Sequence, residues 1–153
     1  MRLWRLSGHE FASVFDGGYG LRFDGRWNTA GHATTYVSTS PSLCVLEKLV
    51  HVEDPTLLPA LDMVAYDVPD GVPVARLTLS DLPGDWRRRE AETQQIGDTW
   101  LSGQDAAVLF VPSAIVALPE SPDENAIINH RHPAASTIQI AWTRPFELDI
   151  RLF

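Results

Sequence analysis

The sequence predicts a single α+β domain with more strands than helices. Its 153 residues suit one compact domain, and hydrophobic residues make up 44% of them, enough for a real core. Short segments with strand-like patterns outnumber those with helical spacing, and the two kinds do not alternate regularly. This balance favours mixed or antiparallel sheets with a few helices. We find no repeat or linker, so we expect residues 1–153 to form one domain.

The first third of the chain predicts two strands and a helix. Residues 2–6 and 34–38 have strand-like patterns, and the glycine-rich stretch 17–31 predicts turns and irregular chain. Ser40-Pro41 is a good helix start, because serine can cap and proline suits the first helical position. We expect that helix to extend to about residue 51. Its apolar stripe consists of Leu43, Leu46, Leu49 and Val50.

The rest of the chain predicts five more strands and one more helix. The strands are expected at residues 61–68, 73–79, 106–111, 137–142 and 146–152. An amphipathic pattern predicts a helix over 85–102, with Gly103 just past its end. Pro112-Ser113 closes the short buried strand at 106–111.

Composition narrows the classes of function. The chain has 12 basic and 20 acidic residues, a formal net charge of -8, which argues against general binding to nucleic-acid phosphates. A local basic pocket for one small anion stays compatible with this charge. Only Lys48 among the basic residues is lysine, and arginine is the better residue for bidentate contact with phosphate. A GC-rich genome would produce the same bias.

The chain reads as a cytoplasmic domain. Cys44 is the single cysteine, so no intramolecular disulfide can form, as a reducing compartment allows. We find no signal peptide and no apolar stretch long enough for a membrane span. Cys44 lies inside a predicted helix and is expected to be a small buried residue. The glycines do not make a dinucleotide fingerprint or a P-loop, and His130 and His132 alone do not suggest a metal site.

The tetrapeptide Gly25-Arg26-Trp27-Asn28 is the first candidate for ligand binding. Glycine before arginine lets the backbone approach a ligand closely, and the guanidinium offers a planar fork of donors for phosphate. Trp27 could shield that contact or stack on a ring, and Asn28 offers a donor and an acceptor. The alternative is a surface turn with a structural salt bridge.

Further polar residues follow at regular structural positions. Tyr36 and Ser38 share one face of a predicted strand, where the tyrosine could stack on an aromatic ligand or belong to the core. Glu47 sits at the border of the apolar helical stripe, where a partly buried carboxylate needs a partner; an exposed helix glutamate is the alternative. Ser113 could line a pocket or cap the next segment. Asn125 and Asn129 lie together only if their segment is helical.

Taken in order, these segments resemble the RES-domain toxins of RES–Xre type II toxin–antitoxin systems. The resemblance rests on W-R-L at 4–6, G-R-W-N at 25–28, Y-V-S at 36–38, L-E at 46–47, P-S at 112–113, E-N-A-I-I-N-H at 124–130 and F-E-L-D-I-R-L at 146–152. The family is named for an arginine, a glutamate and a serine, which correspond to Arg26, Glu47 and Ser113. The resemblance covers nearly the whole chain, although residues 53–105 contribute little.

The resemblance implies a fold like that of the ADP-ribosylating toxins, NAD as the substrate and growth arrest as the outcome. It implies no cofactor; inorganic phosphate would be a co-substrate if the reaction is phosphorolysis. The implied partner is an Xre-type antitoxin that blocks the active site and carries a helix-turn-helix domain, and a homodimer within that complex is one arrangement. The toxin itself is expected to bind neither nucleic acid nor membrane. Hydrolysis, phosphorolysis and transfer of ADP-ribose to a protein stay open, as does a non-catalytic nucleotide-binding module.

The chemistry of NAD suggests roles for the residues that the resemblance selects. Nicotinamide departs neutral and needs no general acid, so a single carboxylate, Glu47, could stabilise the oxocarbenium-like transition state. Arg26, with Arg5, would bind the pyrophosphate, and Tyr36 would stack near the nicotinamide. Ser113 would contact the ligand or orient Glu47. Trp27, Asn28, Ser38 and Asn125 complete the expected substrate-binding set.

Overall fold

The computed structural model describes all 153 residues and contains one seven-stranded sheet in the order β4-β5-β6-β2-β1-β3-β7. The pairing of β4 with β5 is parallel, and every other pairing is antiparallel. The strands are β1 (Arg2–Gly8), β2 (Thr34–Ser38), β3 (Leu61–Asp67), β4 (Val74–Arg76), β5 (Val108–Pro112), β6 (Glu124–Asn129) and β7 (Gln139–Phe146). The predicted α+β class with a mixed sheet and few helices is confirmed.

Three α-helices and six short 3-10 helices connect these strands. The α-helices are α1 (Gly18–Arg22), α2 (Pro41–Leu49) and α3 (Glu90–Gly103). The 3-10 helices are η1 (His9–Phe11), η2 (Pro55–Leu57), η3 (Leu79–Asp81), η4 (Trp86–Arg88), η5 (Pro133–Thr137) and η6 (Ile150–Leu152). None of the helices is long and apolar enough to cross a membrane.

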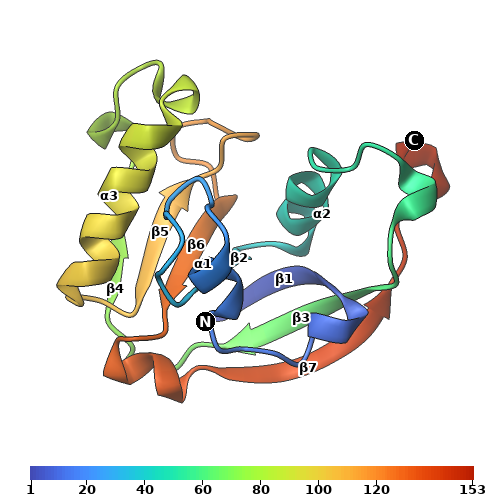
Figure 1. Cartoon of the computed structure of the whole chain (residues 1–153), viewed down its shortest axis with the longest axis horizontal. Helices are drawn as coiled ribbons and strands as arrows, with labels where there is room; N and C mark the ends of the chain where they lie inside the picture. The colour runs from blue at the N-terminus through green and yellow to red at the C-terminus, as the bar shows by residue number, and fades with distance from the viewer.

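The sheet changes direction where β1 meets β2. Those two strands share one registered pair, Trp4 with Ser38, whereas β1 and β3 pair over their full length. Figure 1 shows the consequence: β1, β3 and β7 run across the lower part of the molecule, and β4, β5 and β6 stand beside α3. The helix α2 contacts both β1 and β2, so it packs at this bend. Residues on α2 therefore lie close to the ends of β2 and β6.

The start of α2 follows the sequence signals. The Ser40 side chain accepts a hydrogen bond from the Leu43 backbone N–H at 3.2 Å, and Pro41 occupies the first helical turn. The second predicted helix differs in its bounds, because it begins at Glu90 and not at 85. Residues 86–88 form a separate 3-10 turn before α3, and Trp86 in that turn is buried, with 4% of its surface exposed.

Two predictions about the C-terminal half are wrong. Residues 146–152 form no strand: β7 ends at Phe146, and Asp149 caps the 3-10 helix η6 through the Arg151 N–H. The alternation there does not reflect burial, since Ile150 is 85% exposed. The expected end of α3 also shifts, because Gly103 belongs to the helix and Gln104 ends it with a φ of 58°.

Asn125 and Asn129 lie on the strand β6 and not on a helix. Both side chains point to the same face, yet four residues along a strand separate them by roughly 13 Å. They consequently serve different contacts. The Asn129 amide donates to the Leu101 carbonyl of α3 at 2.9 Å, while Asn125 lies beside α2.

The core divides between the two faces of the sheet. One cluster of fourteen buried residues includes Val64, Tyr66 and Ile128. A second, smaller cluster on the face covered by α3 includes Trp27, Trp86 and Ile127. Tyr36 packs against the second cluster, so this face of β2 and β6 also carries the predicted site residues.

Candidate functional site

Glu47 lies at the centre of a hydrogen-bonded cluster. Its Oε1 accepts a hydrogen bond from the Ser113 hydroxyl at 3.0 Å and a second from the Asn125 amide. The three residues come from α2, from the chain just after β5 and from β6. The other carboxylate oxygen, Oε2, makes no hydrogen bond within the protein, and the side chain is only half-buried. Glu47 is thus held through one oxygen and leaves the other available to a ligand.

The orientation of Asn125 is fixed by Ser38. The Ser38 hydroxyl donates to Asn125 Oδ1 at 2.7 Å, so the amide NH₂ is directed toward Glu47. The two residues are registered partners of β2 and β6, which places their side chains on the same face. Ser38 is therefore indirectly linked to the carboxylate, and it does not contact Glu47 itself.

Ser113 is positioned by the end of β5. Val111 lies on the same face as Asn125, its partner in β6, and alternation places Ser113 on that face too. The side chain is fully buried. Its oxygen also accepts hydrogen bonds from the backbone N–H groups of Ile115 and Val116, at 3.0 and 3.2 Å. The structure confirms that Ser113 caps the next turn and adds a contact with Glu47, while its role in lining a ligand pocket stays a prediction.

The segment Gly25–Asn28 forms a tight turn closed by a hydrogen bond from the Gly25 N–H to the Asn28 carbonyl at 2.9 Å. The Tyr36 hydroxyl reaches into this turn: it donates to Asn28 Oδ1 at 2.7 Å and accepts from the Trp27 N–H at 3.0 Å. A Cβ at position 25 would lie 2.6 Å from that hydroxyl, which explains the glycine. Burial raises the pKa of Tyr36, so its hydroxyl stays protonated.

The structure places Trp27 and Asn28 in supporting positions. Trp27 is 2% exposed and packs 5.9 Å, centroid to centroid, from Trp86, so its ring cannot stack on a ligand without a rearrangement. The Asn28 amide NH₂ donates to backbone carbonyls of the protein, including that of Phe23 at 3.2 Å. Both residues hold the turn that presents Arg26.

Arg26 is half-buried and lies over Trp86, 5.7 Å from the ring centroid. Its guanidinium donates to the Arg87 carbonyl at 3.3 Å and forms no ion pair. The α3 helix fixes the turn from behind, because the Thr93 hydroxyl donates to the Arg26 carbonyl at 2.7 Å. Arg26 makes no hydrogen bond or ion pair with Glu47.

Arg5 lies on the opposite face of the sheet from Glu47. It is the registered partner of Val64, whereas its neighbour Trp4 pairs with Ser38. The Arg5 guanidinium donates to the carbonyls of Phe11 and Val14 at 3.0 and 3.1 Å. It holds the loop after β1, so we leave it out of the site.

The sequence alone gave no reason to select Arg87. This exposed residue donates to the Ala114 carbonyl, 3.4 Å away, directly beside Ser113. It belongs to the middle of the chain, where the resemblance to a known family was weakest. Arg87 therefore contacts both the Arg26 side chain and the residue after Ser113, although no sequence motif includes it.

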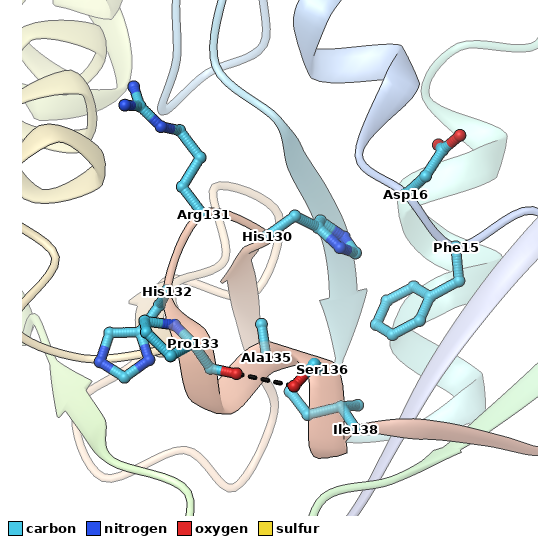
Figure 2. Close-up of a pocket in the computed structure, with 9 residues that line it drawn as sticks. All are labelled: Phe15, Asp16, His130, Arg131, His132, Pro133, Ala135, Ser136 and Ile138. Atoms are coloured by element: carbon cyan, nitrogen blue, oxygen red, sulfur yellow. Dashed lines mark hydrogen bonds between the residues drawn. The ribbon is translucent and has the colours of Figure 1, made fainter.

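A hollow of about 620 Å³ lies on the other face of the sheet (Figure 2). It is lined in part by Phe15, Asp16 and His130. The His130 ring pairs with the Thr35 hydroxyl at 2.8 Å, and Thr35 points away from the face of Tyr36 and Ser38. Burial lowers the pKa of His130 to about 4, so the ring is neutral at pH 7. Its carboxylate, Asp16, accepts one hydrogen bond, from the Gly18 backbone N–H at 2.8 Å, and no side chain donates to it, so the hollow does not resemble the Glu47 cluster.

Cys44 is buried, as the sequence predicts. The thiol is 6% exposed, and burial raises its pKa to about 11. A protonated, enclosed thiol is a poor nucleophile. Among the ionisable groups near this face, the partly exposed Glu47 is thus the better candidate for chemistry.

Comparison with known proteins places these residues in a family. A family model described as "RES domain" matches residues 2–150. The chain is 38% identical to "Toxin Res" of Pseudomonas putida strain KT2440, over the whole length of both chains. It is 36% identical to "Prs ADP-ribosylating toxin" of Sphingobium sp. strain YBL2, over 84% of this chain and 80% of that one. A chain from the crystal structure of the M. tuberculosis MbcT–MbcA toxin–antitoxin complex has a similar fold, with a TM-score of 0.68 at 17% identity, covering 95% of this chain and 83% of the other.

Proposed function

Because the chain belongs to the RES-domain family, we propose that it is the toxin of a toxin–antitoxin system and that it depletes NAD by cleaving the nicotinamide–ribose bond. The relatives named as Res toxins support the first part of this proposal. The geometry of Glu47 supports the second part. Loss of NAD would stop growth, and an antitoxin of the Xre type that covers the Glu47 face would prevent it.

The observation that carries the proposal is the asymmetric binding of the Glu47 carboxylate. Two donors fix Oε1, and Oε2 has no partner in the protein. When the bond from ribose C1′ to nicotinamide breaks, its electron pair goes to the ring nitrogen, and positive charge develops on the sugar. A fixed carboxylate beside the ribose would stabilise that charge. Water or inorganic phosphate would then attack C1′ and lose a proton.

The leaving group explains why one carboxylate suffices. Nicotinamide in NAD is a cation and departs neutral, so no acid needs to protonate it. An O-glycoside usually requires a second carboxylic acid for that purpose. The cluster contains one carboxylate and three neutral polar side chains, Ser38, Ser113 and Asn125, which fits cleavage at nitrogen.

Binding of NAD would fall to the turn Gly25–Asn28 and to Tyr36. Arg26 carries a positive charge without a carboxylate partner, which suits the pyrophosphate. The Tyr36 hydroxyl is occupied by the turn, so only its ring could contact the nicotinamide. Trp27 and Asn28 would act by holding Arg26 in place.

Transfer of ADP-ribose to a protein is a second candidate, favoured by the name of the Sphingobium relative. It uses the same bond cleavage with a protein side chain as the acceptor. A non-catalytic nucleotide-binding module is less favoured, since the Glu47 charge would weaken binding of a dianionic ligand unless it assists a cationic transition state.

The test is Glu47→Gln, with Glu53→Gln as the matched control. Gln can still accept from Ser113 and Asn125, and both variants change the net charge equally; Glu53 is exposed just beyond α2. We expect kcat for NAD consumption by the Glu47→Gln protein to fall by about a hundredfold, since a charged interaction of about 3 kcal/mol is lost in the transition state. The control should keep parental activity. Equal rates for both variants would refute the role of Glu47.

Product analysis separates the acceptors. Free ADP-ribose indicates hydrolysis, and ADP-ribose-1″-phosphate formed only with added phosphate indicates phosphorolysis. Label transferred from NAD to protein, with no soluble ADP-ribose, indicates the transferase. Intact NAD in buffer alone, with added phosphate and with added protein would contradict the proposed enzyme activity.

A further inference from the structure

We propose that Arg87 is a second anion-binding residue of this site and that, with Arg26, it binds the two phosphates of a dinucleotide. The inference deepens the proposed function and rests on it, because the ligand class is that of NAD. It adds a residue from the η4 segment, which neither the family motif nor the sequence pattern marks.

Arg87 contacts both Arg26 and the residue that follows Ser113. Its side chain donates from Nη1 to the Ala114 carbonyl at 3.4 Å, one residue from Ser113. Its own backbone carbonyl accepts from Arg26 Nη1 at 3.3 Å. Through these two contacts, both guanidinium groups are held at η4, and that of Arg87 lies next to the residue that follows Ser113. Figure 1 shows η4 above α3, close to the chain that follows β5.

The position of Arg87 is fixed by its buried neighbour. Trp86 is 4% exposed and packs against Trp27, so η4 is tied to the turn that carries Arg26. The Arg26 guanidinium lies over the same Trp86 ring. One buried tryptophan thereby sets the relative placement of two arginines, which is what a preorganised anion site requires.

The charges of Arg26 and Arg87 are uncompensated within the protein. The arginines that form ion pairs with carboxylates are Arg2, Arg76, Arg89 and Arg151. Arg26 and Arg87 instead donate to neutral backbone carbonyls at 3.3 and 3.4 Å, which are long hydrogen bonds. An anion could replace these contacts at small cost. In a chain of net charge -8, two such arginines would supply the positive charge that a dianionic ligand needs.

The number of arginines suits a pyrophosphate. Each phosphate of NAD carries one negative charge, and a guanidinium can bind two oxygens of one phosphate. Arg26 alone would leave the second phosphate without a charged partner. Arg87 supplies it from the side of Ser113 and so determines a preference for dinucleotides over mononucleotides.

The test compares Arg87→Ala, Arg87→Lys and the control Arg88→Ala, all on η4. Arg88 is exposed and makes no side-chain hydrogen bond or ion pair. We expect KM for NAD to rise about tenfold in the Arg87→Ala protein with kcat within about twofold, because a charge-assisted contact is lost in binding. Arg87→Lys should fall between, and Arg88→Ala should match the parent. Nicotinamide mononucleotide, with one phosphate, should show a smaller change.

Binding of ADP-ribose, measured by calorimetry, gives a readout that does not need turnover. Weaker binding by the Arg87→Ala protein, in a parent that leaves NAD intact, would overturn the proposed activity and support the inference. An unchanged KM and an unchanged affinity for ADP-ribose, in a parent that consumes NAD, would overturn the inference alone. A fall in kcat with no change in KM would also overturn it, since Arg87 would then act only on the turn after Ser113. Where the Arg87→Ala protein is poorly folded, Arg87→Gln replaces it, and a parental KM with a parental affinity for ADP-ribose in that folded, uncharged variant would overturn the inference.

Discussion

Replacing Ser113 by alanine tests the cluster most directly, because one oxygen serves both the fold and the carboxylate. The Ser113 hydroxyl donates to Glu47 Oε1 at 3.0 Å and accepts from the N–H groups of Ile115 and Val116. Alanine removes all three contacts and leaves the backbone of β5 unchanged. The structure therefore predicts two separate effects, one on stability and one on rate.

The magnitudes follow from these contacts. Two backbone donors lose their acceptor at a partly buried turn, which should lower the free energy of unfolding by about 1–2 kcal/mol. A hydrogen bond to a charged group is worth about 2 kcal/mol if it is needed in the transition state, or about thirtyfold in kcat. The first effect is independent of the charge on Glu47, and the second depends on it.

A double-mutant cycle with Glu47→Gln separates the two effects. Urea unfolding of the parent, both single variants and the double variant should show the same loss of stability from Ser113→Ala in both backgrounds. NAD consumption should show a thirtyfold loss in the parent background and less than about fivefold beside Gln. If Ser113→Ala slows the reaction equally in both backgrounds, Ser113 does not act through Glu47 and the assignment is refuted.

Three further changes test how the site is supported. Tyr36→Phe removes the acceptor for the Trp27 N–H, so the free energy of unfolding should fall by about 1–3 kcal/mol; an unchanged urea midpoint would contradict this. Gly97→Ala would place a Cβ 1.7 Å from the Trp27 carbonyl oxygen and should destabilise the protein by at least about 3 kcal/mol, whereas Gly103→Ala, which meets only a side-chain oxygen at 3.6 Å, should be tolerated. Burial lowers the pKa of His130 from 6.5 to about 4, so neutral His130 favours folding above pH 6.5 and that contribution is lost as the pH falls toward 4. His130→Gln should flatten the urea midpoint between those two pH values, and an identical slope in the variant would contradict the argument.

Local signals predicted the elements that carry Glu47 well. The strand at 34–38 has the predicted bounds, and Ser40-Pro41 begins α2 as a capped helix. Those features depend on neighbours in sequence, namely alternation, capping and proline geometry. The strand predicted at 146–152 is absent because a strand also needs a partner that is distant in sequence. The alternating pattern is present, but the structure provides no partner strand beyond the β7 edge, so apolar residues such as Ile150 remain exposed.

The site itself depends on pairings that local pattern cannot reveal. Ser38 and Asn125 meet because β2 pairs with β6 in one register, and a shift by one residue would point Asn125 to the other face. The same alternation places Arg5 on the opposite face of β1 from Trp4, which the W-R-L motif alone does not reveal. Sequence could therefore nominate polar residues, but only the register of the sheet decides which of them surround Glu47.

The arrangement also explains why so much of the Gly25–Asn28 motif is buried. An arginine that binds a flexible dianion must lose side-chain freedom, and that cost falls if the protein orders it in advance. Trp27, Asn28 and Tyr36 interlock around the turn, and Trp86 lies under the guanidinium of Arg26. On this reasoning the residues beside Arg26 need never touch a ligand. Under the proposed function, their contribution to binding would be the fixed position of the Arg26 charge.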